Sequence, residues 1–306
     1  MLPDIKISVI ITTHDRPDKV KRAILSLAQQ LRLPDEVIIV DDGSELPYDK
    51  TVLQLFPPSV RVLPLSLAPA HGVSAARNYG VAQSRSAYIC FLDDDDVFCT
   101  NKLQELVLEL VKNDFPDVIF HAADIVFPNE GLSYTSAKPA LTHLSHDILL
   151  YNILGSASRI ACRREFFRRV GGFDETIKAS EDWELWIRLI CNGARVTYID
   201  KSLIRYECMT RNGSLSKGED NNKHGRQCIY RKYASTYAEM SESDHYLCQQ
   251  YDEKDRFWRF IVNYQQRSAL QSAWRLFCMN KNFSSALLLI LTLWGPRAVL
   301  RARSLR

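Results

Sequence analysis

The 306-residue sequence lacks several patterns that would each indicate a definite class of protein. Its eight cysteines lie between Cys90 and Cys278, with neither a C-x-x-C pair nor a zinc-binding spacing, so we expect reduced thiols packed in the interior. The N-terminus has no basic segment followed by an apolar one, so we expect no signal peptide. Internal repeats and low-complexity tracts are absent as well. These absences favour an ordinary folded protein of the cytoplasm.

A strong charge of one sign is also missing. The formal net charge is +3, which is too small to indicate a nucleic-acid partner, and none is expected. Hydrophobic residues make up 46% of the chain and charged residues 25%, which is ordinary for a folded domain. Basic residues concentrate in the C-terminal third, and this local bias matters more than the total.

Short apolar runs alternate with helical patterns in the first part of the chain. Residues 6–13 and 36–40 are rich in β-branched residues and are typical of buried parallel strands. Pro17 suits the first turn of a helix between them. The apolar positions of that helix fall on one face: Val20, Ile24, Leu27, Ala28 and Leu31. This order predicts a βαβ unit and a parallel sheet.

Four consecutive carboxylates, Asp93 to Asp96, follow the apolar residues 88–92. Four adjacent like charges repel one another, so burying them would be costly without cations. In open α/β sheets, ligands bind beyond the carboxyl ends of the strands, and carboxylate oxygens suit a hard divalent metal. The alternative is a solvated acidic turn. An EF-hand loop fits poorly, because its glycine and distal Glu are missing.

Further elements are expected along the chain. Gly72 allows a tight turn before a helix at 73–80 that Ser74 can cap. Arg77, one turn into that helix, either faces an anionic ligand or belongs to an ordinary helix. The remaining expectations are strands at 60–63, 117–127, 156–162 and 195–207, a helix from about 101, and an irregular loop at 128–146.

Two glycines and a carboxylate-rich helix follow. Gly171 and Gly172 give the turn before Phe173 backbone freedom. Ser180 is placed to cap a helix that opens with Glu181 and Asp182. Acidic residues in a first turn often only complement the helix dipole, which is the alternative to a catalytic role.

Beyond about residue 220 the composition is helical. Residues 286–294 form the most apolar stretch, which is shorter than the ~20 residues of a membrane-spanning helix. Arg297, Arg301, Arg303 and Arg306 follow it. We expect 283–306 either to lie on the anionic surface of the inner membrane, facing the cytoplasm, or to dock on the catalytic domain or a second subunit.

Six segments stand in one order: S-V-I-I-T-T-H-D-R-P, E-V-I-I-V-D-D-G-S, G-V-S-A-A-R-N-Y-G, Y-I-C-F-L-D-D-D-D, G-G-F-D-E and S-E-D-W-E-L-W. Together they resemble the family 2 glycosyltransferases, which are inverting, nucleotide-sugar-dependent enzymes. The resemblance spans about residues 5–216. It implies an α/β protein of the GT-A fold, Rossmann-like, with a mostly parallel central sheet flanked by helices and a C-terminal helical extension. The implied division is a catalytic domain at 1–216, with a nucleotide-sugar half at 1–98 and an acceptor half at 99–216, and a helical region at 217–306.

The resemblance also implies donor-binding residues. Thr12 and His14 would border the nucleotide base, with Arg16 beside them, and Asp42 would accept a hydrogen bond from the pyrimidine. Arg77 would contact the base or the diphosphate. Asp93 and Asp94 would lie near the ribose, and Asp95, with Asp93, would hold Mg²⁺ or Mn²⁺. Asp96 is expected to have a structural role.

The same resemblance implies an acceptor side. Asp182 would be the catalytic base, with Glu181 beside it, and Trp183 and Trp186 would offer an apolar platform to a sugar. Such a base is required because the acceptor hydroxyl must lose its proton as it attacks the anomeric carbon. Arg211 stands where many relatives carry a metal-binding His. Arg cannot ligate a cation but can neutralise a diphosphate.

The function implied is transfer of a sugar, from a UDP-sugar, to a hydroxyl of a growing bacterial surface glycan. The acceptor would be a glycan or a lipid-linked glycan. The first rival is a metal-dependent nucleotidyltransferase, which would release pyrophosphate and leave the E-D-W helix without a role. The second is a nucleotide-sugar-binding subunit that has lost catalysis, which retention of the acidic run and Asp182 argues against.

Overall fold

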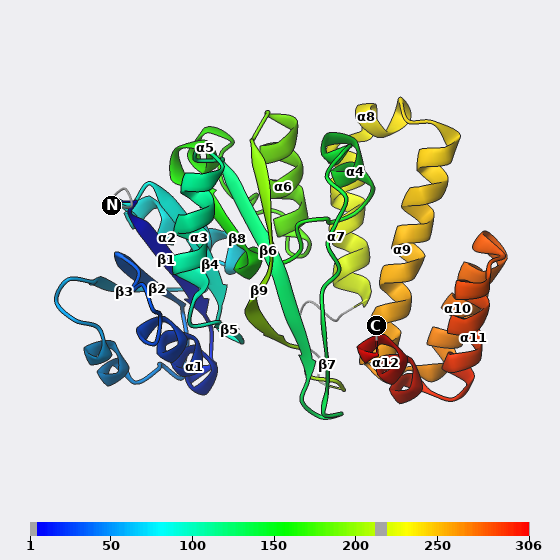
Figure 1. Cartoon of the computed structure of the whole chain (residues 1–306), viewed down its shortest axis with the longest axis horizontal. Coiled ribbons are helices and arrows are strands. Elements are labelled where there is room, and N and C mark those ends of the chain that lie inside the picture. The colour runs from blue at the N-terminus through cyan, green and yellow to red at the C-terminus, as the bar shows by residue number, and fades with distance from the viewer. Residues whose placement is uncertain (1–4, 212–218, 306) are drawn as a thin grey trace. The chain divides into compact units, whose positions relative to one another are not determined.

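A computed structural model describes residues 5–211 and 219–305 of the protein. A strand–helix–strand unit opens it (Figure 1). The strands β1 (Ile7–Thr13) and β2 (Glu36–Asp42) are buried along their whole length and pair in parallel. The helix α1 (Pro17–Ala28) joins them and begins at its proline, whose missing N–H costs nothing there. The predicted βαβ unit is therefore confirmed.

The central sheet has a parallel half and a second half that contains antiparallel pairs. β3 (Arg61–Leu67), β2, β1 and β4 (Tyr88–Asp93) run parallel to one another in that order. Beyond β4 the order continues with β8 (Ile160–Arg163), β6 (Val118–Phe127), β9 (Val196–Glu207) and β5 (Asp96–Phe98). The pairs β4–β8, β8–β6 and β9–β5 are antiparallel. A short strand, β7 (Leu132–Thr135), pairs with β6.

Several helices and helical turns connect these strands, and each has buried residues. They are η1 (Lys50–Leu55), α2 (Val73–Gln83), α3 (Lys102–Lys112), η2 (Ala157–Arg159), α5 (Arg164–Arg169) and α6 (Glu181–Cys191). Of these, α3 and α6 are clearly amphipathic. The helix α2 approaches β1 closely at Gly80, where an added Cβ would lie 2.6 Å from Ile10 Cγ2. Glycine at this position lets α2 and its Arg77 settle directly on the sheet.

Three local expectations are wrong. Leu31 lies beyond the end of α1 and is 72% exposed. Ser74 is the second residue of α2, after Gly72 at the N-cap, and caps nothing. Ser180 precedes α6 in the left-handed conformation, with φ of 61°, and its side chain makes no capping bond. A capping Ser needs an extended backbone, so neither residue can reach the amides of the first turn.

The stretch 128–146 is also more ordered than the irregular loop expected. It contains β7 and the start of α4 (Leu144–Leu150). A four-residue strand at an edge carries too little apolar periodicity to be recognised from sequence.

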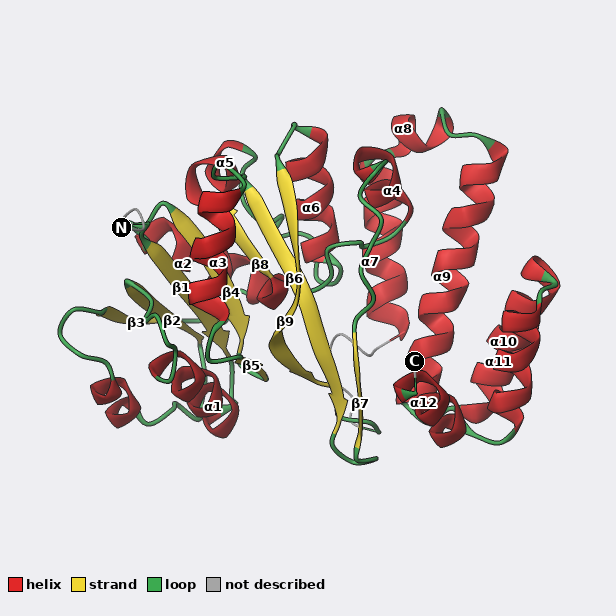
Figure 2. Cartoon of the chain, in the orientation of Figure 1, coloured by secondary structure: helices red, strands yellow, loops and turns green. Residues whose placement is uncertain are grey.

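The chain divides into two compact units. The first comprises residues 1–124, 135–145 and 153–206, and the second 125–134, 146–152 and 207–306. After β9 the described chain of the second unit is helical (Figure 2). Its helices are α7 (Glu219–Lys232), α8 (Ala234–Ala238), α9 (Glu242–Val262), α10 (Gln266–Asn280), α11 (Phe283–Leu293) and α12 (Pro296–Ser304).

The helical C-terminal region is thus confirmed, whereas its expected boundary, between residues 216 and 217, lies outside the described residues. A core of its own holds this unit together, with Phe257, Ile261 and Leu276 among its members. Within the described residues, no helix combines the length and the apolar character needed to cross a membrane.

Candidate active site

The carboxyl ends of three parallel strands meet at one edge of the sheet. In register, Thr12 of β1 lies between Val40 of β2 and Asp93 of β4. Parallel strands end together, so the polar residues that follow β1, β2 and β4 gather at this edge. The sequence-predicted donor residues are brought together here for that reason.

Arg77 of α2 joins two carboxylates that are distant in the sequence. Its Nη2 donates to Asp93 Oδ1 at 2.6 Å, and its Nη1 donates to Glu181 Oε1 at 2.9 Å. The side chain is 5% exposed, and its guanidinium lies 5.0 Å from the centre of the Phe173 ring. The end of β4 and the start of α6 are therefore held together by a buried, shared cation. Its expected contact with the nucleotide stays a prediction.

Asp182 lies beside this ion pair. Burial and the neighbouring Glu181 carboxylate raise the pKa of Asp182 to about 7, against the opposing effects of Arg77 and the Trp183 amide. That amide donates to Asp182 Oδ1 at 2.6 Å. A carboxylate whose pKa lies near 7 can exchange protons at neutral pH, which is what a general base requires.

Two basic residues at the start of α1, Arg16 and Lys19, pair with carboxylates of the acidic turn after β4. Asp94 accepts from Thr13 Oγ1 at 2.9 Å and from Arg16 Nη1 at 3.1 Å. Burial raises the pKa of Asp94 to about 6, while Arg16 opposes the rise. Asp95 is more open, at 36% side-chain exposure, and lies 3.5 Å from Arg16 and 3.6 Å from Lys19.

Asp96 lies deeper, at 1% exposure. Burial, followed by the charges of Asp93 and Asp95, raises its pKa well above the ordinary range. A protonated Asp96 adds no charge to the interior, which relieves the repulsion among four adjacent carboxylates. This arrangement agrees with a structural place for Asp96 beneath the turn.

Asp93 and Asp95 are suited to a divalent cation that substrate phosphates and water also coordinate. Among the described residues, no three His, Cys, Asp or Glu side chains gather as a complete metal cage. Mg²⁺ is usually held by one or two carboxylates together with substrate phosphates and water, and does not need such a cage. The side chains of Asp93 and Asp95 are 27% and 36% exposed, so their oxygens are accessible for that arrangement.

Asp42 and His14 form the adjoining corner of the site. The Asp42 carboxylate accepts from the backbone amides of His71 and Gly72, both at 2.8 Å, and so fixes the turn before α2. His14 Nδ1 lies 2.8 Å from the Asp42 carbonyl oxygen, and the residue is exposed. The exposed imidazole of His14 is accessible for stacking on a base. Each Asp42 carboxylate oxygen already accepts one hydrogen bond, so a bond from a pyrimidine would be a second one.

The expected acceptor platform is contradicted by burial. Trp186 is 0% exposed, and its Nε1 donates to the Gly155 carbonyl at 2.9 Å. Its ring packs edge-on against Phe173 at 6.4 Å between centres. Trp183 is 4% exposed. The two indoles support the site from the core, because the apolar face of α6 turns both of them inward.

Arg211 belongs to the second unit. It has φ of 63°, and its guanidinium lies 4.1 Å from the centre of the Tyr264 ring. The residues after it, including Gly213 and Ser214 of the polar loop, lie outside the described residues. Its expected contact with the diphosphate stays a prediction.

Two positioning residues escaped the sequence analysis. Asn78 follows Arg77, and its amide bonds both the Phe173 nitrogen (2.8 Å) and the Phe173 carbonyl (2.9 Å). Ser158 Oγ accepts from the Asp93 amide at 2.9 Å, and its carbonyl accepts from Lys102 Nζ at 2.6 Å. Asn78 lies within the motif segment G-V-S-A-A-R-N-Y-G, so its position in the sequence could have indicated a role at the site. No sequence pattern indicated a role for Ser158, because its partners are remote in the sequence.

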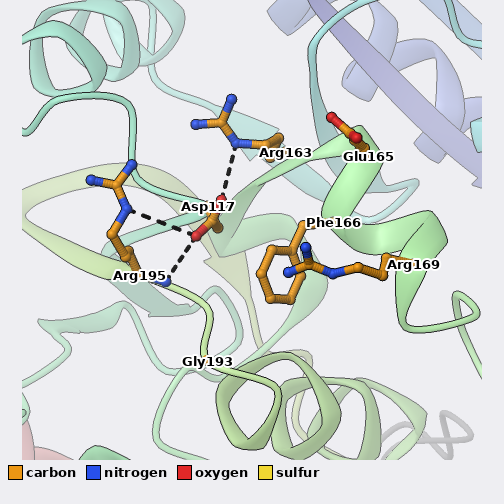
Figure 3. A pocket seen from close by; sticks show the side chains of 7 residues that line it. All are labelled: Asp117, Arg163, Glu165, Phe166, Arg169, Gly193 and Arg195. Carbon is orange, nitrogen blue, oxygen red and sulfur yellow. Dashed lines mark hydrogen bonds and ion pairs between the residues drawn. The ribbon is translucent and has the colours of Figure 1, made fainter.

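A separate pocket of about 340 Å³ lies at the other end of the sheet (Figure 3). Its lining includes Arg163 and Arg195, both paired with Asp117, and Arg169 stacked on Phe166. Arg163 pairs in register with Tyr88, the first residue of β4, whereas Asp93 is the last. Five strand steps, roughly 17 Å, therefore separate this pocket's edge from the acidic turn.

Solved structures show which class of fold this is. S. aureus TarS residues 1–349, in a crystal structure with UDP-GlcNAc, superpose with a TM-score of 0.60 at 16% identity, over 98% of this chain and 90% of that one. The UDP complex of the same protein gives a TM-score of 0.54 at 16% identity, over 97% and 91%. The fold shared is GT-A, as expected, with C-terminal helices.

The sequence profile described as Glycosyl transferase family 2 matches residues 8–171, which is more than half of the chain. The chain belongs to that family, and the resemblance found from its motifs is confirmed. The matched range contains the acidic turn, Arg77 and the first of the two glycines before Phe173.

Curated relatives agree with this membership. The chain is 28% identical to an uncharacterized glycosyltransferase of Haemophilus influenzae over 243 residues, 78% of this chain and 80% of that protein. It is 30% identical to the amylovoran biosynthesis glycosyltransferase AmsB of Erwinia amylovora over 231 residues, 71% and 75%. It is 32% identical to the pre-mycofactocin glycosyltransferase of Mycobacterium tuberculosis over 216 residues, 67% and 43%.

Proposed function

We propose that this chain is an inverting glycosyltransferase that moves a hexosyl or N-acetylhexosaminyl group from a UDP-sugar to a hydroxyl of a growing bacterial surface glycan. A uridine donor is supported by the UDP and UDP-GlcNAc complexes of TarS, which has the same fold. A polysaccharide acceptor is supported by the relative named for amylovoran biosynthesis. Lipopolysaccharide, O-antigen, capsule and exopolysaccharide are the acceptor classes of this proposal.

The observation that carries the proposal is the half-buried carboxylate of Asp182 beside the pair of Arg77 with Asp93. We assign Asp182 as the base that takes the proton of the acceptor hydroxyl. Its pKa of about 7 suits that step near neutral pH. Burial and the charge of Glu181 raise the pKa of Asp182, and the charge of Arg77 lowers it. Arg77 also donates to Asp93 on the donor side.

On the donor side we assign Thr12, His14, Arg16 and Asp42 to the nucleotide and Asp93 and Asp94 to the ribose. Asp95, with Asp93, would hold Mg²⁺ or Mn²⁺, which when bound would neutralise charge that develops on the diphosphate. Arg211 is assigned to the diphosphate because a guanidinium can pair with phosphate oxygens. Residues 1–98 would form the donor half, 99–216 the acceptor half, and 217–306 the helical region.

The test is product analysis with the full chain. We expect UDP release from a UDP-sugar that rises when a glycan acceptor is added. Pyrophosphate release would instead identify a nucleotidyltransferase, and donor binding without any release would identify a binding subunit. Screening nucleotide-sugars for thermal stabilisation, with and without Mn²⁺, selects the donor for this assay.

A further inference from the structure

The helix α11 is built with its polar side inward. Ser285 is 6% exposed and Thr292 is 0% exposed, although both carry hydroxyls. Burial is tolerated because Ser285 Oγ donates to the Asn282 carbonyl at 2.9 Å and Thr292 Oγ1 donates to the Leu288 carbonyl at 2.6 Å. Both hydroxyls are thereby satisfied by the helix backbone and need no water.

The opposite side of α11 is an apolar stripe, defined by exposed Phe283, Ile290 and Trp294 and half-buried Leu287. At 100° per residue these four positions fall within an arc of about 60°, and Ser285 and Thr292 lie roughly opposite. Phe283 is 81% exposed, Ile290 52% and Trp294 82%. Soluble helices normally show the reverse arrangement, so this stripe marks a surface that is covered in use.

The segment of chain that carries the stripe has side-chain charge of one sign. Residues 256–306 contain nine Lys and Arg and no Asp or Glu, and α11 itself has no charged residue. Lys281 is exposed just before α11, and Arg297 and Arg301 are exposed on α12 after it. Gln266 bonds the Thr292 and Leu293 carbonyls, which brings the exposed Arg267 to the same end. Cations thus stand at both ends of the stripe, and residues 256–306 supply no anion.

We propose that the α11 stripe inserts into the interface of an anionic lipid bilayer. An apolar stripe ending in an indole suits the headgroup boundary, and flanking cations suit anionic headgroups. The eleven residues of α11 extend roughly 16 Å, about half the thickness of a hydrocarbon core, so the helix lies along the surface. A second copy of this chain explains the stripe less well, because two such surfaces would bring their cations together.

The test uses the full chain with sedimentation of phosphatidylcholine vesicles and of vesicles containing about 30% phosphatidylglycerol. We expect binding to the anionic vesicles that weakens as salt rises. The double variant Phe283→Ser, Trp294→Ser should lose at least tenfold in partitioning, and Arg297→Gln, Arg301→Gln on the order of tenfold, with a smaller salt effect. Leu31→Ser, Leu46→Ser is the matched control, since both leucines are exposed on the first unit.

Circular dichroism and thermal melting establish that each variant is folded. Equal binding of native protein and Phe283→Ser, Trp294→Ser, or no binding to anionic vesicles, would overturn the proposal. The stripe would instead be a contact between copies if the native protein forms oligomers and does not bind vesicles, while the double variant is monomeric. None of these measurements uses a sugar donor, so their outcome is independent of the proposed reaction.

Discussion

Asp93 at the end of β4 and Glu181 at the start of α6 accept hydrogen bonds from the same guanidinium, that of Arg77. The strand that carries the acidic turn and the helix that carries Asp182 are thereby held at a fixed separation. The buried cation offsets two of the carboxylates, which would otherwise repel one another and Asp182. The relationship explains how an acidic cluster persists in a largely buried place.

Asp182→Asn should abolish turnover and preserve donor binding. The amide matches the carboxylate in shape but cannot take a proton, so we expect kcat to fall by about 10²–10⁴-fold. The donor dissociation constant, measured by calorimetry, should change by less than about threefold, since Asp182 serves the acceptor. Asp200→Asn, at an exposed carboxylate, is the control. Near-normal turnover in Asp182→Asn would show that another group is the base.

The pH profile should report the state of Asp182. A base must be ionised to act, so kcat/KM should be full above pH 7 and be lost as the pH falls through about 7. Glu181→Gln removes a charge that raises the pKa of Asp182, so the acidic limb should move to lower pH by roughly one unit. Glu165→Gln, on α5, should leave the limb in place. An acidic limb that stays at the same pH in Glu181→Gln would contradict its assignment to Asp182.

Asp95→Asn should weaken donor binding and turnover together. The expected loss is on the order of tenfold in donor affinity, because a charged ligand to the cation is removed. The loss in kcat should be at least as large, because the cation also offsets charge that develops on the leaving diphosphate in the transition state. Titration of Mn²⁺ against donor-induced thermal stabilisation measures the effect, and a chelator should reproduce it in the native protein. Asp18→Asn, exposed on α1, is the comparison. Unchanged Mn²⁺ dependence would remove Asp95 from the metal site.

Asn78→Ala should loosen the turn that supports Arg77. Two hydrogen bonds to the Phe173 backbone are lost, and we expect the free energy of unfolding to fall by about 1–3 kcal/mol. Because Phe173 lies against the Arg77 guanidinium, kcat should fall as well. Urea denaturation and steady-state kinetics measure the two effects. Asn113→Ala, at the end of α3, should leave kcat unchanged; an equal loss there would indicate a general effect on folding.

Glu36→Gln should weaken the sheet and its acid tolerance. Burial alone would raise the pKa of Glu36, but hydrogen bonds from Ser8, the Arg85 amide, Arg61 and Ser86 lower it to about 2. Its folded pKa lies below the unfolded value of 4.5, so its stabilisation is fully present above pH 4.5 and is lost as the pH falls towards 2.

We therefore expect Glu36→Gln to cost about 1–3 kcal/mol at pH 7, with a smaller decline in stability between pH 4.5 and 2 than in the native protein. Chemical denaturation across this pH range measures both. The exposed Glu45→Gln is the control. A parallel decline in native protein and Glu36→Gln would mean that other carboxylates dominate acid unfolding.

The sequence by itself determined the strands β1, β2 and β4, the βαβ unit, the α6 helix and the order of the motif segments. These features depend on hydrophobic periodicity and turn residues, which are local and can be recognised in a short window. Family membership followed from the same segments. The strand pairings beyond β4 and the short β7 were less accessible, because strand pairing depends on partners elsewhere in the chain.

Only the tertiary structure decided which groups Arg77 binds, that Trp186 lies in the core, and that Ser180 adopts a left-handed backbone in place of a cap. It also decided that α11 turns Phe283, Ile290 and Trp294 outward. Each of these depends on which surfaces meet in space, and a residue's type does not specify its neighbours. Burial then acts on the charges that have met, which is how Asp182 acquires a pKa near 7 that no sequence pattern contains.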